Sequence, residues 1–208
     1  MMNNPIDTTM AEALRILRSG GVILYPTDTV WGIGCDATDP AAVARVYEIK
    51  RRADSKALVL LADSLDMVAK YVHEIPDAAI QLVEVNDVPM TVIYPGAYVG
   101  KTPAPGEKAV ADRHFLAYNA VAEDGSVGIR IPMMEFCRNL VYKLGRPLVS
   151  TSANISGEPT PKQFKEIPQE IVDAVDYVVN PRLERESTGV SSQILKVGLR
   201  GEIEIIRK

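Results

Sequence analysis

The hydrophobic and polar positions of this chain follow two patterns in turn. In some stretches apolar residues recur every three or four positions, which predicts amphipathic helices; short continuous apolar runs between them predict buried strands. One predicted helix follows a capping box at 9–12 and ends at Gly20, and the others cover 41–50, 65–71, 77–85, 135–144 and 169–175. The predicted strands cover 22–25, 57–61, 90–94, 127–131, 148–150, 177–179, 193–197 and 202–206.

Local signals support several of these boundaries. Asp39 followed by Pro40 is typical of a helix start, because aspartate caps free backbone N–H groups and proline suits the first helical position. Gly145 is typical of a helix end. Residues 95–124 are rich in proline and glycine, which predicts a long loop or hairpin insertion. The alternation of elements predicts one α/β domain over residues 1–208, with a twisted, mixed, open sheet flanked by helices.

The composition fits a globular protein with a sizeable core, since 47% of the 208 residues are hydrophobic and the mean hydropathy is +0.02. The net charge of −4 excludes a basic nucleic-acid coat, so contacts with RNA or phosphate have to come from a local patch. Cys35 and Cys137 have no CxxC spacing, which predicts reduced thiols and a cytoplasmic location. We also expect no signal peptide and no membrane span, because the apolar runs are too short.

The common nucleotide-binding fingerprints fail in this sequence. Residues 96–102 are one residue short of a Walker A loop, and the prolines that follow would break the helix that such a loop opens. Gly32 and Gly34 lack the third glycine of the dinucleotide fingerprint. His73 and His114 have no cysteine beside them, so we predict ordinary surface or loop histidines rather than a zinc site.

Three polar segments could nevertheless build a site. The first, residues 26–34, directly follows the strand predicted at 22–25. Thr27, Asp28 and Thr29 offer hydroxyl and carboxylate groups there, and Trp31 offers an aromatic wall. The alternative is a turn that its own side-chain hydrogen bonds stabilise, with the tryptophan in the core.

The second segment is cationic and the third is rich in hydroxyl groups. Lys50, Arg51, Arg52 and Lys56 could converge on a triphosphate, although cations at a helix C-terminus are also favoured by the helix dipole. Residues 150–157 could bind ribose, phosphate or substrate, or could form a polar transition from strand to loop. Local chemistry alone leaves each alternative open.

Together these segments resemble the YrdC-like family, the threonylcarbamoyl-AMP synthases. Residues 26–34 are similar to its PT[DE]TVYGLG segment, Lys50 and Arg52 fit its KxR element, and Ser152 and Asn154 fit its SxN element. Further similarities follow in the same order along the chain: residues 90–92 to PLT[LIV], 127–132 to VG[VI]RxP, 191–194 to PSTVV, and Arg207 to a late arginine. The matches cover nearly the whole chain.

The resemblance implies a nucleotidyltransferase that joins L-threonine, bicarbonate and ATP into L-threonylcarbamoyladenylate and releases pyrophosphate. The product would feed N6-threonylcarbamoyladenosine formation on tRNA through the tRNA threonylcarbamoyl-transfer machinery. A carbamate made from threonine and bicarbonate attacks the α-phosphate, so no protein nucleophile is required. The protein then has to position its substrates and neutralise phosphate charge.

The resemblance also implies roles for individual residues. Lys50 and Arg52 are the expected catalytic residues, which hold the triphosphate together with Mg²⁺. We expect no protein side chain to serve as a metal ligand. Asp28 is expected either to order its loop or to help hold a cation. The expected ATP-binding residues are Lys50, Arg52, Lys56, Thr91, Ser152, Asn154 and Ser191. The expected threonine-binding residues are Thr29, Arg130 and Ser150, with Arg130 pairing the carboxylate.

The sequence departs from the family pattern in several places. Trp31 replaces a tyrosine, Leu61 replaces a histidine that contacts substrate in some members, and residues 87–91 replace PGPLT. Alanines at positions 53 and 57 replace common prolines, so the loop after the KxR element should be less rigid. The long stretch at 95–124 is expected to act as a lid or an assembly element. The chain resembles the short form of the family, without a second C-terminal domain.

Two other functions stay open. One is a non-enzymatic module that binds double-stranded RNA or assists ribosome maturation, although the net charge of −4 counts against this as the sole role. The other is a divergent paralogue with another nucleotide-dependent activity. The presence of both the KxR and the SxN element argues against it.

Overall fold

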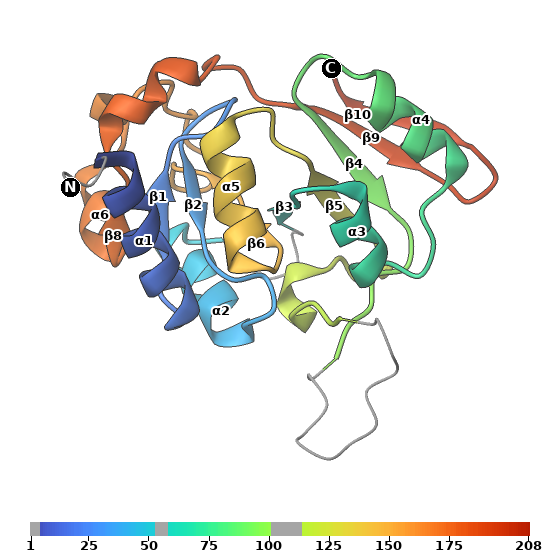
Figure 1. Ribbon diagram of the computed structural model, residues 1–208, viewed down its shortest axis with the longest axis horizontal. Helices are drawn as coiled ribbons and strands as arrows, with labels where there is room; N and C mark the ends of the chain where they lie inside the picture. Colours follow the sequence, from blue (N-terminus) through green and yellow to red (C-terminus); the bar gives the residue numbers. More distant parts are fainter. Residues whose placement is uncertain (1–4, 53–57, 101–113) are drawn as a thin grey trace.

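The computed structural model describes residues 5–52, 58–100 and 114–208 (Figure 1). The helices are α1 (Pro5–Arg18), α2 (Pro40–Ile49), α3 (Leu65–Tyr71), α4 (Asp77–Val85), α5 (Glu135–Leu144) and α6 (Gln169–Ala174), with 3₁₀ turns η1 (Tyr118–Ala120), η2 (Phe164–Glu166) and η3 (Pro181–Glu186). The strands are β1 (Ile23–Tyr25), β2 (Gly32–Gly34), β3 (Val59–Leu61), β4 (Met90–Tyr94), β5 (Val127–Arg130), β6 (Leu148–Val149), β7 (Thr151–Ser152), β8 (Tyr177–Val178), β9 (Gln193–Val197) and β10 (Ile203–Arg207). The predicted α/β class is confirmed.

The strands divide into two mixed sheets. The first has the order β7-β2-β1-β8 and the second the order β10-β9-β4-β5-β3-β6. Both contain parallel and antiparallel pairs: β1 runs parallel to β8 and antiparallel to β2, and β4 runs parallel to β9 and antiparallel to β5. Figure 1 shows the two sheets side by side along the long axis of the molecule. The mixed sheet predicted from the sequence is therefore split in two.

The chain passes from one sheet to the other at Ser150. Strand β6 pairs with β3 in the six-stranded sheet, whereas β7 pairs with β2 in the four-stranded sheet. The backbone N–H of Ser150 donates to the carbonyl oxygen of Val59, at 2.8 Å. The polar segment that follows β6 therefore lies where the two sheets meet.

Strands β2 and β7 are not among the strands predicted from the sequence. They are only three and two residues long, and their sequences are GIG and TS. Strand β7 forms by pairing with β2, more than a hundred residues earlier in the chain, and β2 forms by pairing with β1. Gly34 permits this pairing, because a Cβ atom there would lie 2.6 Å from both Tyr25 Cε1 and the carbonyl oxygen of Val149.

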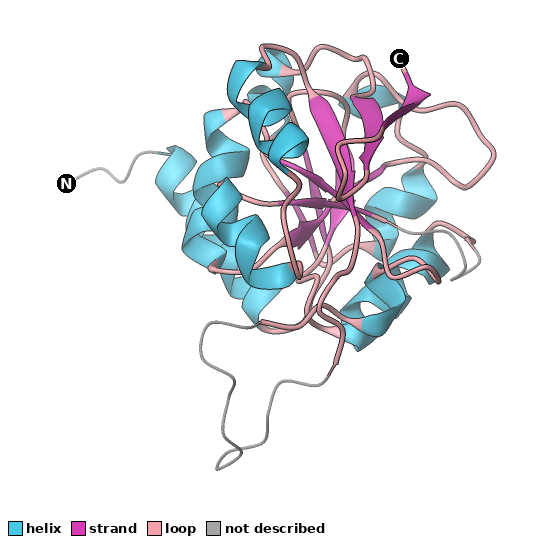
Figure 2. Ribbon diagram, turned by 90° about the vertical axis from the view of Figure 1, so that its right-hand side faces the viewer, coloured by secondary structure: helices cyan, strands magenta, loops and turns pink. Residues whose placement is uncertain are grey.

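Helices flank the strands in Figure 2, whereas β10 lies at the outer edge near the C-terminus and its residues are exposed. Helix α1 packs against α5, and each contributes buried apolar residues such as Leu17 and Leu140. None of the helices in the described part of the chain is both long and apolar enough to cross a membrane.

The capping predictions are confirmed at two positions and wrong at one. The Asp39 side chain accepts from the backbone N–H groups of residues 41 and 42, and Gly145 ends α5 with a φ of 73°. The box at 9–12 does not start a helix, because α1 already begins at Pro5 and Thr9 is a buried residue within it. Proline at the first helical position starts the helix one turn earlier.

The stretch at 95–124 is partly built into the fold. Bridges join Val72 to Ala97 and Val99 to Leu116, and η1 follows with Ala120 buried. Residues 101–113 lie outside the described residues. The role of the stretch at 95–124 as a lid or an assembly element stays a prediction.

Candidate functional site

A cavity of about 270 Å³ opens where the two sheets meet. Its walls come from the β1–β2 loop, the end of β5, the chain crossing at Ser150 and the strands β9 and β10. Among the described residues that line it, eight carry hydroxyl groups, three are arginines and none is acidic. The polar lining residues are Thr27, Thr29, Arg52, Arg130, Ser150, Thr151, Ser152, Thr160, Ser191, Ser192 and Arg207. This set of donors suits a ligand with several negative charges.

The cationic segment reaches the cavity through the end of α2. Arg51 N–H donates to Glu48 O and Arg52 N–H donates to Tyr47 O, both at 3.0 Å, which is the Schellman arrangement of a helix end. Arg51 takes the left-handed position of that arrangement, with a φ of 50°. Its side chain pairs with Glu170 on the exposed surface, at 2.5 Å. The turn therefore separates three consecutive cations, and of the three only Arg52 lines the cavity.

Lys50 is buried behind the cavity wall, with 2% of the residue exposed. Its Nζ donates to the backbone carbonyl oxygens of Ser152 and Asn154, the latter at 2.8 Å, and lies 3.4 Å from Asn154 Oδ1. Burial, with a smaller effect from the charge of Arg52, lowers the pKa of Lys50 to about 8. The KxR and SxN elements are thus joined directly, through the lysine of one and the backbone of the other.

The SxN segment is further fixed by its own side chains. Ser152 Oγ donates to Asn154 Oδ1 at 2.5 Å, and Asn154 Nδ2 donates to the carbonyl oxygen of Glu158 at 2.7 Å. Ser152 lines the cavity, whereas Asn154 is buried behind it.

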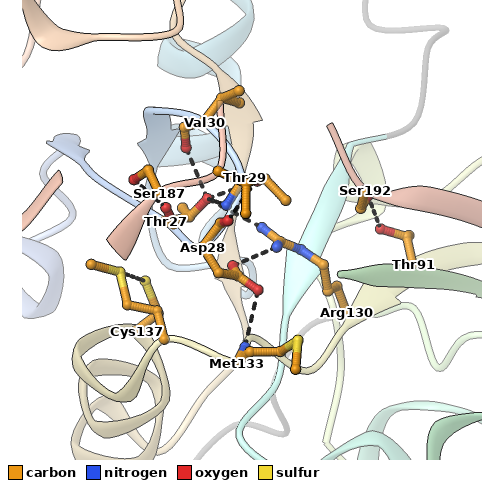
Figure 3. Close-up of polar contacts among 12 residues, drawn as sticks. Thr27, Asp28, Thr29, Val30, Thr91, Arg130, Met133, Cys137, Ser187 and Ser192 are labelled. Atoms are coloured by element: carbon orange, nitrogen blue, oxygen red, sulfur yellow. Dashed lines mark hydrogen bonds and ion pairs between the residues drawn. The ribbon is translucent and has the colours of Figure 1, made fainter. Parts of the chain in front are cut away.

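Arg130 and Asp28 form a buried ion pair on the opposite wall (Figure 3). Arg130 Nη1 lies 2.5 Å from Asp28 Oδ1, and the second carboxylate oxygen accepts from Met133 N–H at 3.0 Å. The Thr27 hydroxyl lies 2.8 Å from that of Thr29 and 3.4 Å from Arg130 Nη2. Of the two alternatives for Asp28, the structure favours ordering of the loop.

The third wall contains Ser192 and Arg207, and Thr91 supports it from behind. Thr91 Oγ1 lies 2.8 Å from Ser192 Oγ, as Figure 3 shows, and Arg207 Nε donates to the carbonyl oxygen of Ser192 at 2.9 Å. Burial lowers the pKa of Arg207, and the charge of Arg130 lowers it further. Thr91 does not itself line the cavity but holds the hydroxyl of Ser192.

Trp31 is both a wall and part of the core. It lines the cavity while its side chain is fully buried. Its Nε1–H donates to Glu184 Oε2 at 2.8 Å, and its ring centroid lies 5.0 Å from that of Phe164. Glu184 also accepts from the backbone N–H of Phe164, so one carboxylate ties the first loop to the segments around η2 and η3.

The structure brings most of the predicted site residues to this cavity. Those in its lining are Thr29, Arg52, Arg130, Ser150, Ser152 and Ser191. Lys50, Thr91 and Asn154 support the lining from behind, and Lys56 lies outside the described residues. The sequence interpretation assigned no role to Thr160, Ser192 or Arg207. Arg207 and Ser192 did carry signals, the first at the family's late arginine and the second within the PSTVV-like segment at 191–194.

The residues present do not fit a metal ion held by the protein alone. No cluster of three or more His, Cys, Asp or Glu side chains with metal-binding geometry occurs among residues 5–52, 58–100 and 114–208. Guanidinium groups and hydroxyls line the cavity, and Mg²⁺ prefers carboxylate oxygens and substrate phosphates.

Comparisons with known proteins place the chain in a family. A family model described as "Telomere recombination", covering the Sua5, YciO and YrdC proteins, matches residues 15–208. Threonylcarbamoyl-AMP synthase of Pseudoalteromonas translucida is 33% identical over 177 residues, which make up 85% of this chain and 88% of that protein.

Solved structures share the fold at lower identity. P. abyssi Sua5 complexed with L-threonine superimposes with a TM-score of 0.73 and 24% identity over 92% of this chain, which spans about half (51%) of that Sua5 chain. E. coli YciO superimposes with a TM-score of 0.71 and 21% identity, covering 96% of this chain and 88% of that one. The family model and the relative at 33% identity confirm the resemblance seen in the sequence: the chain belongs to the Sua5, YciO and YrdC family.

Proposed function

We propose that this protein is an L-threonylcarbamoyladenylate synthase, a nucleotidyltransferase that makes threonylcarbamoyl-AMP and pyrophosphate from L-threonine, bicarbonate and ATP. One observation carries the proposal. The KxR, SxN, PT[DE]TVYGLG-like and VG[VI]RxP-like segments, spread over a hundred residues, meet at one cavity lined by three arginines and eight hydroxyl residues. Two relatives that are 33% and 32% identical over most of the chain carry the name threonylcarbamoyl-AMP synthase.

The lining supports a division of tasks between the walls. Arg52 and Arg207, with the hydroxyls of Ser152 and Ser191, would bind phosphate and nucleotide through charged hydrogen bonds. Thr29, Arg130 and Ser150 would bind threonine, with the guanidinium of Arg130 pairing its carboxylate. Catalysis then comes from alignment of the carbamate with the α-phosphate and from stabilisation of the charge that develops there.

Three of the predicted ATP-binding residues take a supporting role in this proposal. Lys50 holds the backbone of residues 152–154 in place, Asn154 fixes the same turn, and Thr91 orients Ser192. Lys56 remains a predicted triphosphate contact. Lys50 therefore acts on the reaction through the cavity wall, and Arg52 is the cation of the pair that touches phosphate.

Some parts of the proposal come from the family resemblance alone. We expect Mg²⁺ to arrive with the substrate, bound by the phosphates of ATP. Bicarbonate, transfer of the product to tRNA by the threonylcarbamoyl-transfer machinery, direct contact with RNA, a cytoplasmic location and the action of residues 1–208 as one domain stay predictions. A role confined to binding double-stranded RNA is disfavoured, because the cavity is built for small anions.

The proposal is tested by pyrophosphate release from purified protein. Release is expected only when ATP, L-threonine and bicarbonate are all present, and Arg52→Ala is expected to abolish it. Arg51→Ala is the matched control, since Arg51 neighbours Arg52 but points to Glu170 on the surface. Release that is absent, or that does not depend on threonine, would contradict the proposed function.

A further inference from the structure

Asp28 is a buried carboxylate that does not line the cavity but holds a residue that does. The side chains of Arg130 and Asp28 are 4% and 7% exposed. Both oxygens of Asp28 are engaged, one with Arg130 Nη1 at 2.5 Å and the other with Met133 N–H at 3.0 Å. A carboxylate used in this way is not available to a substrate or a cation.

The backbone that carries this carboxylate is held by a segment that is distant in sequence. Residues 187–189 run along the first loop and hold its backbone. Thr188 N–H and Thr188 Oγ1 both bond to the carbonyl oxygen of Asp28 at 3.1 Å, and Gly189 N–H donates to that of Thr29 at 2.7 Å. Because the backbone of Asp28 is held by this strap, its side chain is a fixed reference for the guanidinium of Arg130.

The ion pair with Asp28 also balances the positive charge of Arg130. A guanidinium has five N–H donors in a planar fork; Asp28 accepts from Nη1 and Thr27 Oγ1 lies 3.4 Å from Nη2, so these two contacts do not use all five donors. The adjacent negative charge balances the arginine in a site where an unpaired charge is costly. Arg130 then presents directional N–H donors, while the net charge of the Arg130–Asp28 pair is close to zero. Such a pair suits the single carboxylate of an amino acid better than a polyphosphate.

We propose that Asp28 is a positioning residue that orients and neutralises Arg130, so that this arginine selects the carboxylate of the amino-acid substrate. The inference rests on the proposed function and adds to it the group that sets the selectivity of the threonine wall. It predicts that loss of the Asp28 charge affects threonine and ATP unequally, which a general structural role would not do.

The test measures the KM for threonine and for ATP separately, by pyrophosphate release. Asp28→Asn is expected to raise the KM for threonine about tenfold or more while the KM for ATP changes less than about twofold, since a charged hydrogen bond is lost on one wall only. Asp124→Asn is the matched control: Asp124 also pairs with a cation, Lys196 at 3.0 Å, but lies away from the cavity, so both constants should stay unchanged.

A double variant keeps the inference testable if Asp28→Asn unfolds. Asp28→Asn/Arg130→Gln removes both charges and should fold better than the single variant; in calorimetry it should bind L-threonine no more weakly than Arg130→Gln alone, because Asp28 acts on threonine only through Arg130. Equal changes in the two KM values, or an unchanged KM for threonine, would overturn the inference and leave the proposed function intact. A wild-type protein without threonine-dependent release would instead overturn the proposed function.

Discussion

Two buried cations flank the cavity, and the protein holds them in opposite ways. Arg130 faces a carboxylate, so its charge is balanced within the fold. Among the described residues, Lys50 faces carbonyl oxygens, two from the backbone and one from the Asn154 amide. Burial, with a smaller effect from the charge of Arg52, lowers the pKa of Lys50 to about 8. The comparison shows that pairing with a carboxylate keeps Arg130 a hydrogen-bond donor at every working pH. Lys50 has no carboxylate partner among the described residues, so the charge that it donates to the carbonyl oxygens depends on pH.

The largest effect should come from removing each cation alone. Arg130→Met leaves Asp28 buried without its partner, which should lower the free energy of unfolding by about 3–5 kcal/mol. Lys50→Met leaves neutral carbonyls without a donor, which should cost about 1–3 kcal/mol. Urea unfolding at pH 7 measures both.

A third variant controls for general sensitivity of the fold. Lys196→Met removes the cation of an exposed pair with Asp124 and should change the stability by less than about 1 kcal/mol. If Lys50→Met cost more than Arg130→Met, the distinction between the two cations would be lost.

The second prediction concerns pH and sharpens the same distinction. Because the pKa of Lys50 is about 8 in the folded protein and near 10.5 when unfolded, the unfolded state binds more protons between these values. The stability of wild type relative to Lys50→Met should therefore rise as the pH increases from 8 to 10.5, by up to about 3 kcal/mol.

The measurement is urea unfolding of both proteins at several pH values across that window. Subtracting the Lys50→Met curve removes the titration of all other groups. Below pH 8 the difference between the two proteins should be constant. A difference that falls as the pH rises would mean that burial does not disfavour the charge of Lys50.

The smallest effect concerns the residue that separates Lys50 from Arg52. Arg51 adopts a φ of 50°, which side chains other than glycine adopt at a cost. Arg51→Gly should therefore be about 1–2 kcal/mol more stable than Arg51→Ala. Both variants lose the pair with Glu170, so thermal unfolding of the two isolates the backbone contribution. Equal stability would show that the helix end does not depend on the left-handed position.

Much of the fold could be predicted because its signals are local. The Asp39–Pro40 start of α2, the bounds of α3 and α4 and the end of α5 at Gly145 all follow from residues within one turn of each other. The first helix shows the limit of such signals. The box at 9–12 has the right spacing for a cap, but it lies inside a helix that Pro5 had already begun.

The site was predictable as a set of segments but not as an arrangement. Patterns in the sequence identified the segments around Thr29, Arg52, Arg130 and Ser152, and all four side chains line one cavity. No pattern indicated that Thr160 would join them, and the match at 191–194 gave Ser192 no role of its own. Only the packing of these stretches brings both side chains to the cavity.

The sequence by itself determined the α/β class, most helix boundaries and the family to which the chain belongs. The tertiary structure decided which way neighbouring cations face: Lys50 inward to the carbonyls, Arg51 outward to Glu170 and Arg52 into the cavity. It also decided that short segments such as β2 and β7 are strands. The physical reason is range. Caps and helical periods act between residues a few positions apart, whereas strand pairing and charge burial depend on groups a hundred residues away.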